Sequence, residues 1–208
     1  MPRTTAPIAR RKAARGGRRP VSSRRGKEMA DRGTAVFPSA LGWIAILGRG
    51  DVVQRVTFGH DSPQQAMTAL EEGALEPRNS RAWNPRLVAR LQAFIEHGKD
   101  DFRDVPVDLG SCTTFQRRVL EACRRIPYGR TMSYGELAAA AGYPRAARAV
   151  GSVMANNQFS LIVPCHRVLA AGGRLGGYSN RLGLAMKKRL LALEAENPLR
   201  PRRAAKRR

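Results

Sequence analysis

The chain has 208 residues, of which 42% are hydrophobic, so it can bury the core of one large domain or two small ones. Its apolar runs are too short to span a membrane, no secretory signal is recognised, and three cysteines with three histidines form neither a disulfide framework nor a zinc pattern. These features predict a protein of a reducing compartment, which we expect to be the cytoplasm, with no membrane partner, metal or cofactor.

The formal net charge of +22 is concentrated at the two ends of the chain. Residues 1–33 hold eleven Lys or Arg against two acidic residues, and residues 197–208 hold six Lys or Arg and no acidic residue. These ends carry +9 and +6, which leaves +7 for residues 34–196. Such charge predicts a polyanionic partner, most often nucleic acid. The alternative is a pair of solvated tails that raise solubility.

Residues 1–33 lack apolar periodicity and are rich in Arg, Gly and Pro, which predicts a disordered basic tail. An Arg-rich start that is poor in acidic residues also resembles an organelle transit peptide. A third interpretation places the natural start at Met29 and treats the upstream residues as an over-extended reading frame. Residues 197–208 are interpreted as a second basic tail.

Residues 34–108 are predicted to form a small α+β domain. Two strand-like runs, 41–47 and 52–58, flank a hairpin signal at residues 48–51. A helix is predicted over residues 63–72.

A second helix of this domain is expected to begin with Asn84 as N-cap and Pro85 at the first helical position, and to run to about His97. Its apolar face is predicted to comprise Leu87, Leu91 and Phe94 or Ile95. We recognise no chemical constellation in this half, so His60 and His97 are interpreted as ordinary surface or capping residues.

Residues 109–196 are predicted to form a second, mainly helical domain. Residues 100–108 before it are interpreted as a linker or an edge strand. Thr113 or Thr114 can cap a helix that ends at residues 127–129. One side of this helix carries Phe115, Val119, Leu120 and Ile126.

Two short helices joined by a tight turn are predicted next. Ser133 and Glu136 have the spacing of a capping box, and the helix after them ends at Gly142. A second helix is expected over about 145–154, and the pair indicates a helix-turn-helix. Arg148 stands among small residues that allow close approach, either to another protein segment or to a DNA minor groove. These small residues are Ala146, Ala147, Ala149 and Gly151.

A cysteine next to a histidine interrupts an apolar stretch. Residues 161–163 and 168–169 predict buried strand on either side of a short polar insert, and Pro164 stops the sheet pattern. A thiol attacks as thiolate and an imidazole can take its proton, so Cys165 and His166 are candidate catalytic residues. Neighbours in a strand point to opposite faces, so the pair must lie on a bend or act through water. The alternative is a structural cysteine beside a hydrogen-bonded histidine.

The last helix is predicted over about 184–196. Glu194 lies on the same side as Leu190 and Leu191, so it borders the buried face. A partly buried carboxylate needs a partner, and His166 is a candidate. The alternative places Glu194 at the surface of the helix end.

The run Pro164-Cys165-His166-Arg167-Val168 resembles the active-site signature of the O6-alkylguanine-DNA alkyltransferases, also called methylated-DNA–protein-cysteine methyltransferases. The resemblance extends over residues 114–194 and more loosely back to about residue 36. Its supporting segments, in the family's order, are residues 133–134, 146–151, 156–157 and 177–179. It implies an α/β (α+β) fold: a small N-terminal sheet-plus-helix domain, then a mainly helical C-terminal domain with the helix-turn-helix and the active-site cysteine.

The resemblance also implies roles for individual residues. Cys165 would accept the alkyl group, His166 would draw the thiol proton through a bound water, and Glu194 would orient and polarise His166. Asn157 would brace the active-site turn, and Tyr134 would serve base rotation and proton donation to the guanine ring. The residues implied for DNA contact are Arg148, which fills the gap left by the extruded base, with Ala147, Ala149 and Gly151. Those implied for the substrate pocket are Pro164, Val168, Tyr178 and Ser179.

We therefore expect a monomer that transfers a methyl or small alkyl group once from O6-alkylguanine in double-stranded DNA to Cys165, without metal or cofactor. Extrusion of the base costs a few kcal/mol, which contacts with the deformed DNA would offset. Three other interpretations are a non-catalytic binder of alkylated DNA, a Cys-His hydrolase and a basic architectural protein. The presence of Cys165 argues against the first, and no separate catalytic cysteine signature supports the second.

Overall fold

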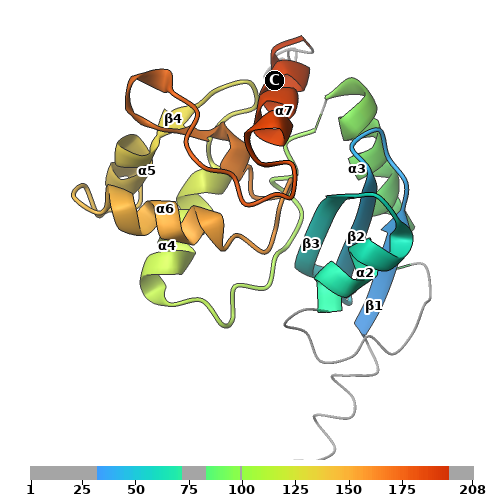
Figure 1. Cartoon of the computed structure of the whole chain (residues 1–208). Coiled ribbons are helices and arrows are strands. Elements are labelled where there is room, and N and C mark those ends of the chain that lie inside the picture. The colour runs from blue at the N-terminus through green and yellow to red at the C-terminus, as the bar shows by residue number, and fades with distance from the viewer. Residues whose placement is uncertain (1–31, 72–82, 99, 197–208) are drawn as a thin grey trace, which may run out of the picture.

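The computed structural model describes residues 32–71, 83–98 and 100–196, and Figure 1 shows a small sheet with two helices beside a second group of helices. The sheet is antiparallel with strand order β1-β2-β3: β1 (Arg32–Phe37), β2 (Trp43–Arg49) and β3 (Val52–His60). The two predicted strands correspond to β2 and β3. Strand β1 was not predicted, and it begins inside the span assigned to the basic tail. The rest of that tail, and residues 197–208, lie outside the described residues.

Strand β1 escapes sequence patterns because one of its buried positions, Gly33, is a glycine and adds no apolar side chain to the pattern. Gly33 faces Trp83, and a Cβ at Gly33 would lie 2.8 Å from the indole Cδ1. Gly48, its partner on β2, would place a Cβ 2.0 Å from the same ring. The two glycines therefore make room for an indole that lies flat on the strands, and the Trp83 Nε1–H donates to the Gly50 carbonyl at 2.8 Å.

The sheet lies between two helices, α2 (Pro63–Glu71) on one face and α3 (Pro85–His97) on the other (Figure 1). Apolar side chains at successive positions of β2 cover both faces of the sheet, because neighbouring side chains of a strand point to opposite faces. Ala45 and Leu47 pack in one cluster with Ala66 and Leu70 of α2. The intervening residues of β2 join the larger cluster that contains the apolar face of α3, namely Ile44, Ile46, Leu87, Leu91, Phe94 and Ile95.

Helix α3 matches its predicted start, end and buried face. The Asn84 side chain accepts from the Leu87 N–H at 3.0 Å, Pro85 stands in the first turn, and Gly98 ends the helix with φ 65°. The left-handed conformation favours glycine because a Cβ would clash with the carbonyl there.

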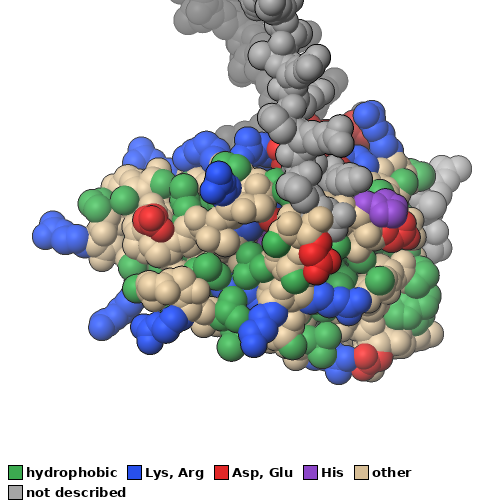
Figure 2. All heavy atoms as spheres, turned by 90° about the horizontal axis from the view of Figure 1, so that it is seen from above, with side chains coloured by type: hydrophobic (Ala, Val, Ile, Leu, Met, Phe, Trp, Pro, Cys, Tyr) green, Lys and Arg blue, Asp and Glu red, His purple; other side chains and the backbone are tan. Residues whose placement is uncertain are grey.

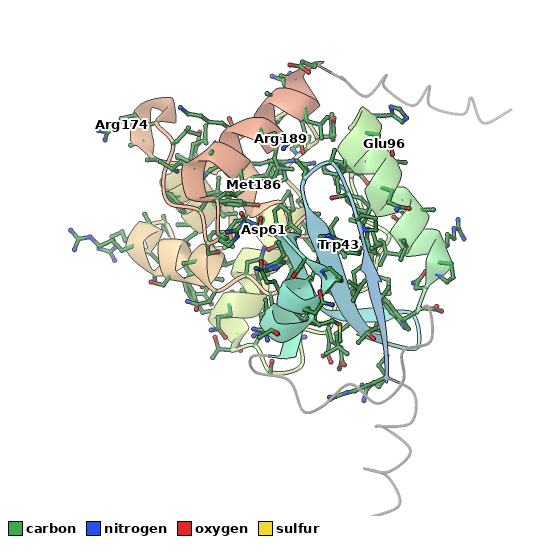
Figure 3. The ribbon with its side chains drawn as sticks, turned by 45° about the vertical axis from the view of Figure 1, so that its right-hand side comes forward. Trp43, Asp61, Glu96, Arg174, Met186 and Arg189 are labelled. Atoms are coloured by element: carbon green, nitrogen blue, oxygen red, sulfur yellow. The ribbon has the colours of Figure 1, made fainter. Side chains whose placement is uncertain are left out.

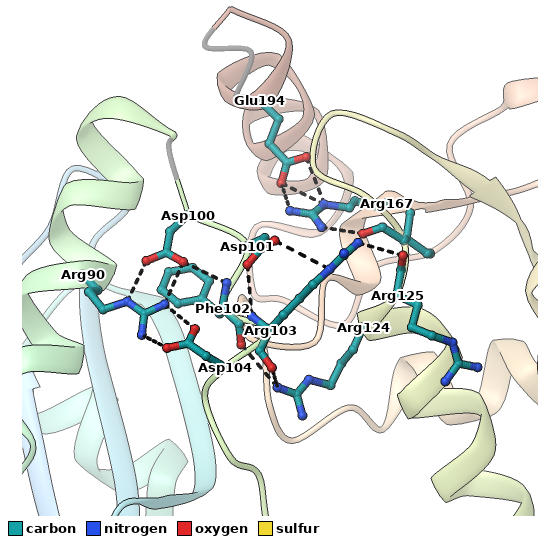
Figure 4. A network of polar contacts seen from close by, with 11 residues as sticks. Arg90, Asp100, Asp101, Phe102, Arg103, Asp104, Arg124, Arg125, Arg167 and Glu194 are labelled. Atoms are coloured by element: carbon teal, nitrogen blue, oxygen red, sulfur yellow. Dashed lines mark hydrogen bonds and ion pairs between the residues drawn. The ribbon is translucent and has the colours of Figure 1, made fainter. Parts of the chain in front are cut away.

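The segment after α3 connects the two parts of the molecule. Arg90 of α3 pairs with Asp100 and Asp104 at 2.7 Å each, as Figure 4 shows. Further on, the Val53 N–H donates to the Pro106 carbonyl at 2.9 Å, so this segment forms a single bridge with β3. The predicted linker or edge strand is thus an extended connection, attached to α3 by ion pairs and to β3 by one bridge.

The C-terminal part contains α4 (Thr114–Arg124), α5 (Tyr134–Ala140), α6 (Ala147–Ala155) and α7 (Gly183–Glu196). Thr113 and Ser133 cap α4 and α5, each in a complete capping box. Helix α4 ends before Ile126, earlier than predicted. Helix α6 begins two residues later than predicted, because Tyr143 and Ala146 form a turn in which the Ala146 backbone is not helical.

One cluster of buried apolar side chains extends from the sheet to α4–α7, so the two predicted domains share a core. The face in Figure 2 shows many Lys and Arg side chains and only small hydrophobic patches. Within the described residues, no helix has the length and apolar character that a membrane crossing requires.

Candidate active site

The Cys-His stretch is a turn rather than the break between two strands. Residues 161–163 were predicted as strand, but Leu161 has φ 72° and the Val163 N–H donates to the Phe159 carbonyl at 2.8 Å, which is turn geometry. Cys165–Arg167 form a 3₁₀ turn. Of the two strands predicted around the Cys-His pair, only the one that follows it is present. This strand, β5 (Val168–Leu169), pairs in parallel with β4 (Met132–Ser133). The bend required for Cys165 and His166 to act together is therefore present.

Asn157 supplies the hydrogen bonds that replace a sheet at this turn. Its side-chain oxygen accepts from the Phe159 N–H at 3.0 Å, and its Nδ2 donates to the Val163 carbonyl at 3.0 Å. Nδ2 also donates to the Cys165 Sγ at 3.2 Å. A side chain that bonds to nearby backbone groups competes with regular secondary structure, which explains why the apolar run is not a strand. Asn157 thus links the backbone of the turn to the thiol.

Cys165 is buried, and its surroundings favour the protonated thiol. Burial raises the pKa of the Cys165 thiol, while the Asn157 hydrogen bond and the nearby Lys187 ammonium act in the opposite direction. A thiol with a raised pKa needs a base before it can attack. The Tyr178 hydroxyl is also buried close to Cys165, and burial raises the pKa of Tyr178 well above its ordinary value.

His166 and Glu194 form a buried pair beside Cys165. The His166 Nε2 and the Glu194 Oε1 lie 2.8 Å apart, and the two side chains are 0% and 1% exposed. Burial alone would raise the pKa of Glu194, but hydrogen bonds from His166 and Arg167 lower it to about 2. An ionised carboxylate only accepts, so Nε2 carries the proton and Nδ1 presents its lone pair. Burial lowers the pKa of His166, which keeps the ring neutral.

Arg167, to which the family resemblance assigns no role, completes this cluster. Its guanidinium donates to both Glu194 oxygens at 2.8–3.0 Å and to the Ile126 carbonyl at 2.9 Å, and Figure 4 shows the pair. The Gly129 N–H donates to the Glu194 Oε2 at 2.9 Å. The buried carboxylate therefore has a cationic partner, and both of its oxygens accept hydrogen bonds. A buried charge is tolerated under these conditions. Of the two interpretations of Glu194, the structure shows the buried one.

Tyr134 lies at the N-terminus of α5 with the loop after β5 against its ring. A Cβ at Gly176 would lie 2.7 Å from the Tyr134 Cε2, so only glycine fits there. The Tyr134 hydroxyl donates to the Gly177 carbonyl at 3.4 Å. Burial raises the pKa of Tyr134 most, and the nearby Cys165 raises it further, so the hydroxyl keeps its proton. Tyr134 and Cys165 thus lie in one site, although they come from distant parts of the sequence.

Lys187 was missed by the sequence analysis. It is 0% exposed, and its Nζ donates to the Val168 carbonyl at 2.5 Å and to the Gly177 carbonyl at 3.4 Å. The Val168 N–H bonds to the Cys165 carbonyl, so both backbone groups of Val168 have partners. A carbonyl has two lone pairs, so the Val168 oxygen can accept one more donor. The sequence signal that could have identified Lys187 is its helical spacing from Leu190 and Glu194, which places all three residues on the buried face of α7.

The remaining pocket residues lie at the edges of the site. Pro164 is buried directly before Cys165, and Ser179 is exposed on the loop that also carries Tyr178. Ser179 and Asn157 line a polar cleft of about 330 Å³ together with residues of β3.

Helix α6 turns its small residues toward solvent. Arg148 and Ala149 are exposed, Ala147 is half-buried, and a Cβ at Gly151 would meet nothing within 4 Å. The side of α6 that packs on the protein instead carries Val150, Val153 and Met154. The small face is therefore not needed for packing among the described residues, which leaves it available for an external surface.

Comparison with known proteins gives the family. Residues 114–196 match the model of the 6-O-methylguanine DNA methyltransferase, DNA binding domain. A methylated-DNA–protein-cysteine methyltransferase of Mycolicibacterium paratuberculosis is 39% identical over 156 residues, which cover 75% of this chain and 88% of that protein. One of Mycobacterium tuberculosis is 42% identical over 142 residues, or 65% of this chain and 82% of that protein.

Solved structures agree with the sequence comparison. The crystal structure of Mycobacterium tuberculosis OGT in complex with DNA has a TM-score of 0.65 and 34% identity, covering 80% of this chain and 95% of that one. The mixed α/β fold and the family resemblance expected from the signature are both confirmed. The chain belongs to the methylated-DNA–protein-cysteine methyltransferase family.

Proposed function

We propose that this protein repairs DNA by moving a methyl or small alkyl group from guanine O6 in double-stranded DNA to the Cys165 Sγ. The observation that carries the proposal is the position of that thiol. It lies 3.2 Å from the Asn157 Nδ2 on a turn that also carries His166, which pairs with the buried Glu194 of α7, in a chain whose relatives are named for this reaction.

The proposed reaction is one displacement. The Cys165 proton passes through a water to the His166 Nδ1, because Nε2 is committed to Glu194 and Nδ1 has no hydrogen-bond partner among the described residues. The thiolate attacks the alkyl carbon, so an S–C bond forms as the C–O bond to guanine breaks. The electron pair leaves on guanine, where the Tyr134 hydroxyl can supply a proton. A thioether is not readily reversed, so each molecule would act once.

DNA binding is proposed for the open face of α6. A base must leave the stack before its O6 substituent can reach a buried thiol, which costs a few kcal/mol. Arg148, with Ala147, Ala149 and Gly151 around it, would enter the minor groove and fill the gap. All the side chains of the proposed site come from one chain, so a monomer is sufficient.

Labelling of the protein tests this function. Duplex DNA carrying a radiolabelled methyl on guanine O6 is incubated with the protein, and the label is mapped by peptide mass. We expect about one label per chain at most, on the peptide with Cys165. Cys165→Ser should lose the label, and Cys112→Ser, a control at a half-buried cysteine, should keep it. Tight lesion binding without label would instead favour the non-catalytic binder, and release of free methanol would favour a hydrolase.

A further inference from the structure

The loop that carries Tyr178 and Ser179 is attached to the N-terminal sheet. We call residues 174–183 the rim loop. Asn180, in its middle, donates from its Nδ2 to the Phe58 carbonyl of β3 at 2.8 Å. Its Oδ1 accepts from the Leu182 N–H at 3.0 Å, so both ends of the amide are used. One side chain therefore shapes the turn into α7 and binds that turn to a strand more than 100 residues earlier.

A glycine near the end of β3 makes this contact possible. Gly59 has φ 84°, a conformation that other residues rarely adopt, and a Cβ there would lie 3.1 Å and 3.2 Å from the Asn180 amide atoms. Glycine thus lets the Asn180 side chain reach the strand. Figure 3 shows Asp61, just after β3, and Met186 of α7 in this region, and a Cβ at Gly59 would also lie 3.2 Å from the Met186 Cε.

Strand β3 holds the opposite side of the site as well. The Val56 N–H donates to the Gln158 carbonyl at 2.8 Å, and Val56 forms a bridge with Phe159. These residues follow Asn157, which bonds to the Cys165 thiol. The cleft of about 330 Å³ lies where the two attachments meet, lined by residues 56–58, 156–158 and 179–181 among others. The same strand therefore sets the distance between the turn with the thiol and the rim loop.

We propose that Asn180 is a positioning residue and that its bond to the Phe58 carbonyl determines how large an alkyl group the site accepts. This inference rests on the proposed transfer to Cys165. Tyr178 and Ser179 directly precede Asn180, so a held Asn180 restricts the outward movement that a bulky O6 substituent requires. Loss of the bond lets the rim loop move outward, which admits a larger group and reduces the preorganisation for a small one.

The test compares single-turnover rates on two duplexes of one sequence, with O6-methylguanine or O6-benzylguanine at the same position. Asn180→Asp keeps an oxygen for the Leu182 N–H but removes the donor to Phe58. We expect its benzyl-to-methyl rate ratio to rise about threefold to tenfold, the factor associated with one neutral hydrogen bond. Thermal unfolding is measured alongside, because a loss of stability alone would lower both rates together.

Two further variants make the test specific. Gly59→Ala disturbs the same contact from β3, so it should raise the ratio as well, and the double variant should add little to Asn180→Asp. Asp61→Asn is the matched control. It breaks the ion pair with Arg181, the next residue of the rim loop, but the pair is 64% and 49% exposed and should contribute little, so we expect the wild-type ratio.

The outcomes separate the two proposals. If the wild-type protein transfers methyl but Asn180→Asp has the wild-type ratio, or loses both rates by one factor, the positioning role is overturned and the proposed function stands. If the wild-type protein transfers neither group, the proposed function is overturned and the positioning role with it.

Discussion

At the scale of single residues, the site depends on side chains that have several partners each. Asn157 bonds to two backbone groups and the Cys165 thiol, and Glu194 bonds to His166, Arg167 and the Gly129 N–H. A buried network of this kind is costly to disturb, because removal of one member leaves the others without partners. The Cys165 thiol is thus held by the same side chain that shapes the turn.

Replacement of Asn157 by alanine should slow transfer and raise the pKa of the thiol. A hydrogen bond to a charged group contributes about 1.5–3 kcal/mol, so the thiolate should become about tenfold to a hundredfold less accessible. Alkylation of Cys165 by iodoacetamide, followed over pH, measures this pKa directly. An unchanged pH profile would show that Asn157 acts on the backbone alone. The unfolding midpoint is measured in parallel, since two backbone groups also lose a partner.

Acid should destabilise the protein through Glu194. Its pKa is about 2 in the folded protein, below the ordinary 4.5, so its contribution is present above pH 4.5 and is lost as the pH falls toward 2. The difference corresponds to about 3 kcal/mol. His166, with its lowered pKa, adds a loss in the same direction that starts below pH 6.5.

Urea unfolding at pH 6, 5, 4 and 3 checks the role of Glu194. Wild-type stability should fall most steeply below pH 4.5. Glu194→Gln should be less stable at pH 6, because Arg167 remains buried without its partner, and it should show a shallower fall below pH 4.5. Parallel curves for the two proteins in this range would rule out Glu194 as the group responsible.

At the scale of elements, α5 contributes a side chain to the candidate site, and α6 presents an open face to solvent. Helix α5 places Tyr134 against the rim loop from its first turn, and α6 buries Val150, Val153 and Met154 while its small face stays open. The turn between them contains Gly142 with φ 87°, so the predicted pair of short helices is confirmed. One face of the pair thus contributes to the site and the other is free to meet DNA.

Arg148→Ala should slow transfer from duplex DNA and spare transfer from a free O6-benzylguanine base. Only the duplex requires a base to be extruded, at a cost of a few kcal/mol, so we expect a loss of about tenfold or more with DNA alone. Arg145→Ala is the matched control, because Arg145 is also exposed but precedes α6. Equal losses on both substrates would place Arg148 in the site rather than in extrusion.

At the scale of the whole molecule, one core joins the sheet to the helices, and β3 contacts both sides of the site. The N-terminal part, in which the sequence shows no chemical constellation, therefore supports the geometry around Cys165. The basic ends lie outside the described residues, and their charge leads us to expect an electrostatic contribution to DNA binding.

Deletion of residues 1–31, which keeps β1 intact, should weaken DNA binding most at low salt. Each phosphate contact contributes about 0.9 to the slope of log affinity against log salt concentration, so the loss of three contacts would reduce the slope by about 3. Fluorescence anisotropy with an unmodified duplex over a salt series measures the slope. An unchanged slope would favour the interpretation of the tail as a solubility segment.

Local signals in the sequence were sufficient for most helices. Asn84 with Pro85, and Ser133 with Glu136, predicted helix starts that the structure confirms, because a cap depends on residues within one turn. The signature around Cys165 likewise identified the family, since a rare run of chemically distinct residues is readable without a fold.

What the sequence could not determine depends on side-chain hydrogen bonds, some within a turn and some between segments that are distant along the chain. The strand expected over residues 161–163 is a turn in which Asn157 bonds to the Val163 carbonyl and the Phe159 N–H, and hydrophobic periodicity does not reveal a competing side chain. Lys187 and Arg167 resemble ordinary cations until folding places Val168 and Glu194 beside them. Composition and local pattern thus determined most of the elements, the family and the candidate nucleophile, whereas the tertiary structure decided the hydrogen bonds around the thiol and the attachment of the rim loop to β3, because contacts between distant segments exist only after the chain has folded.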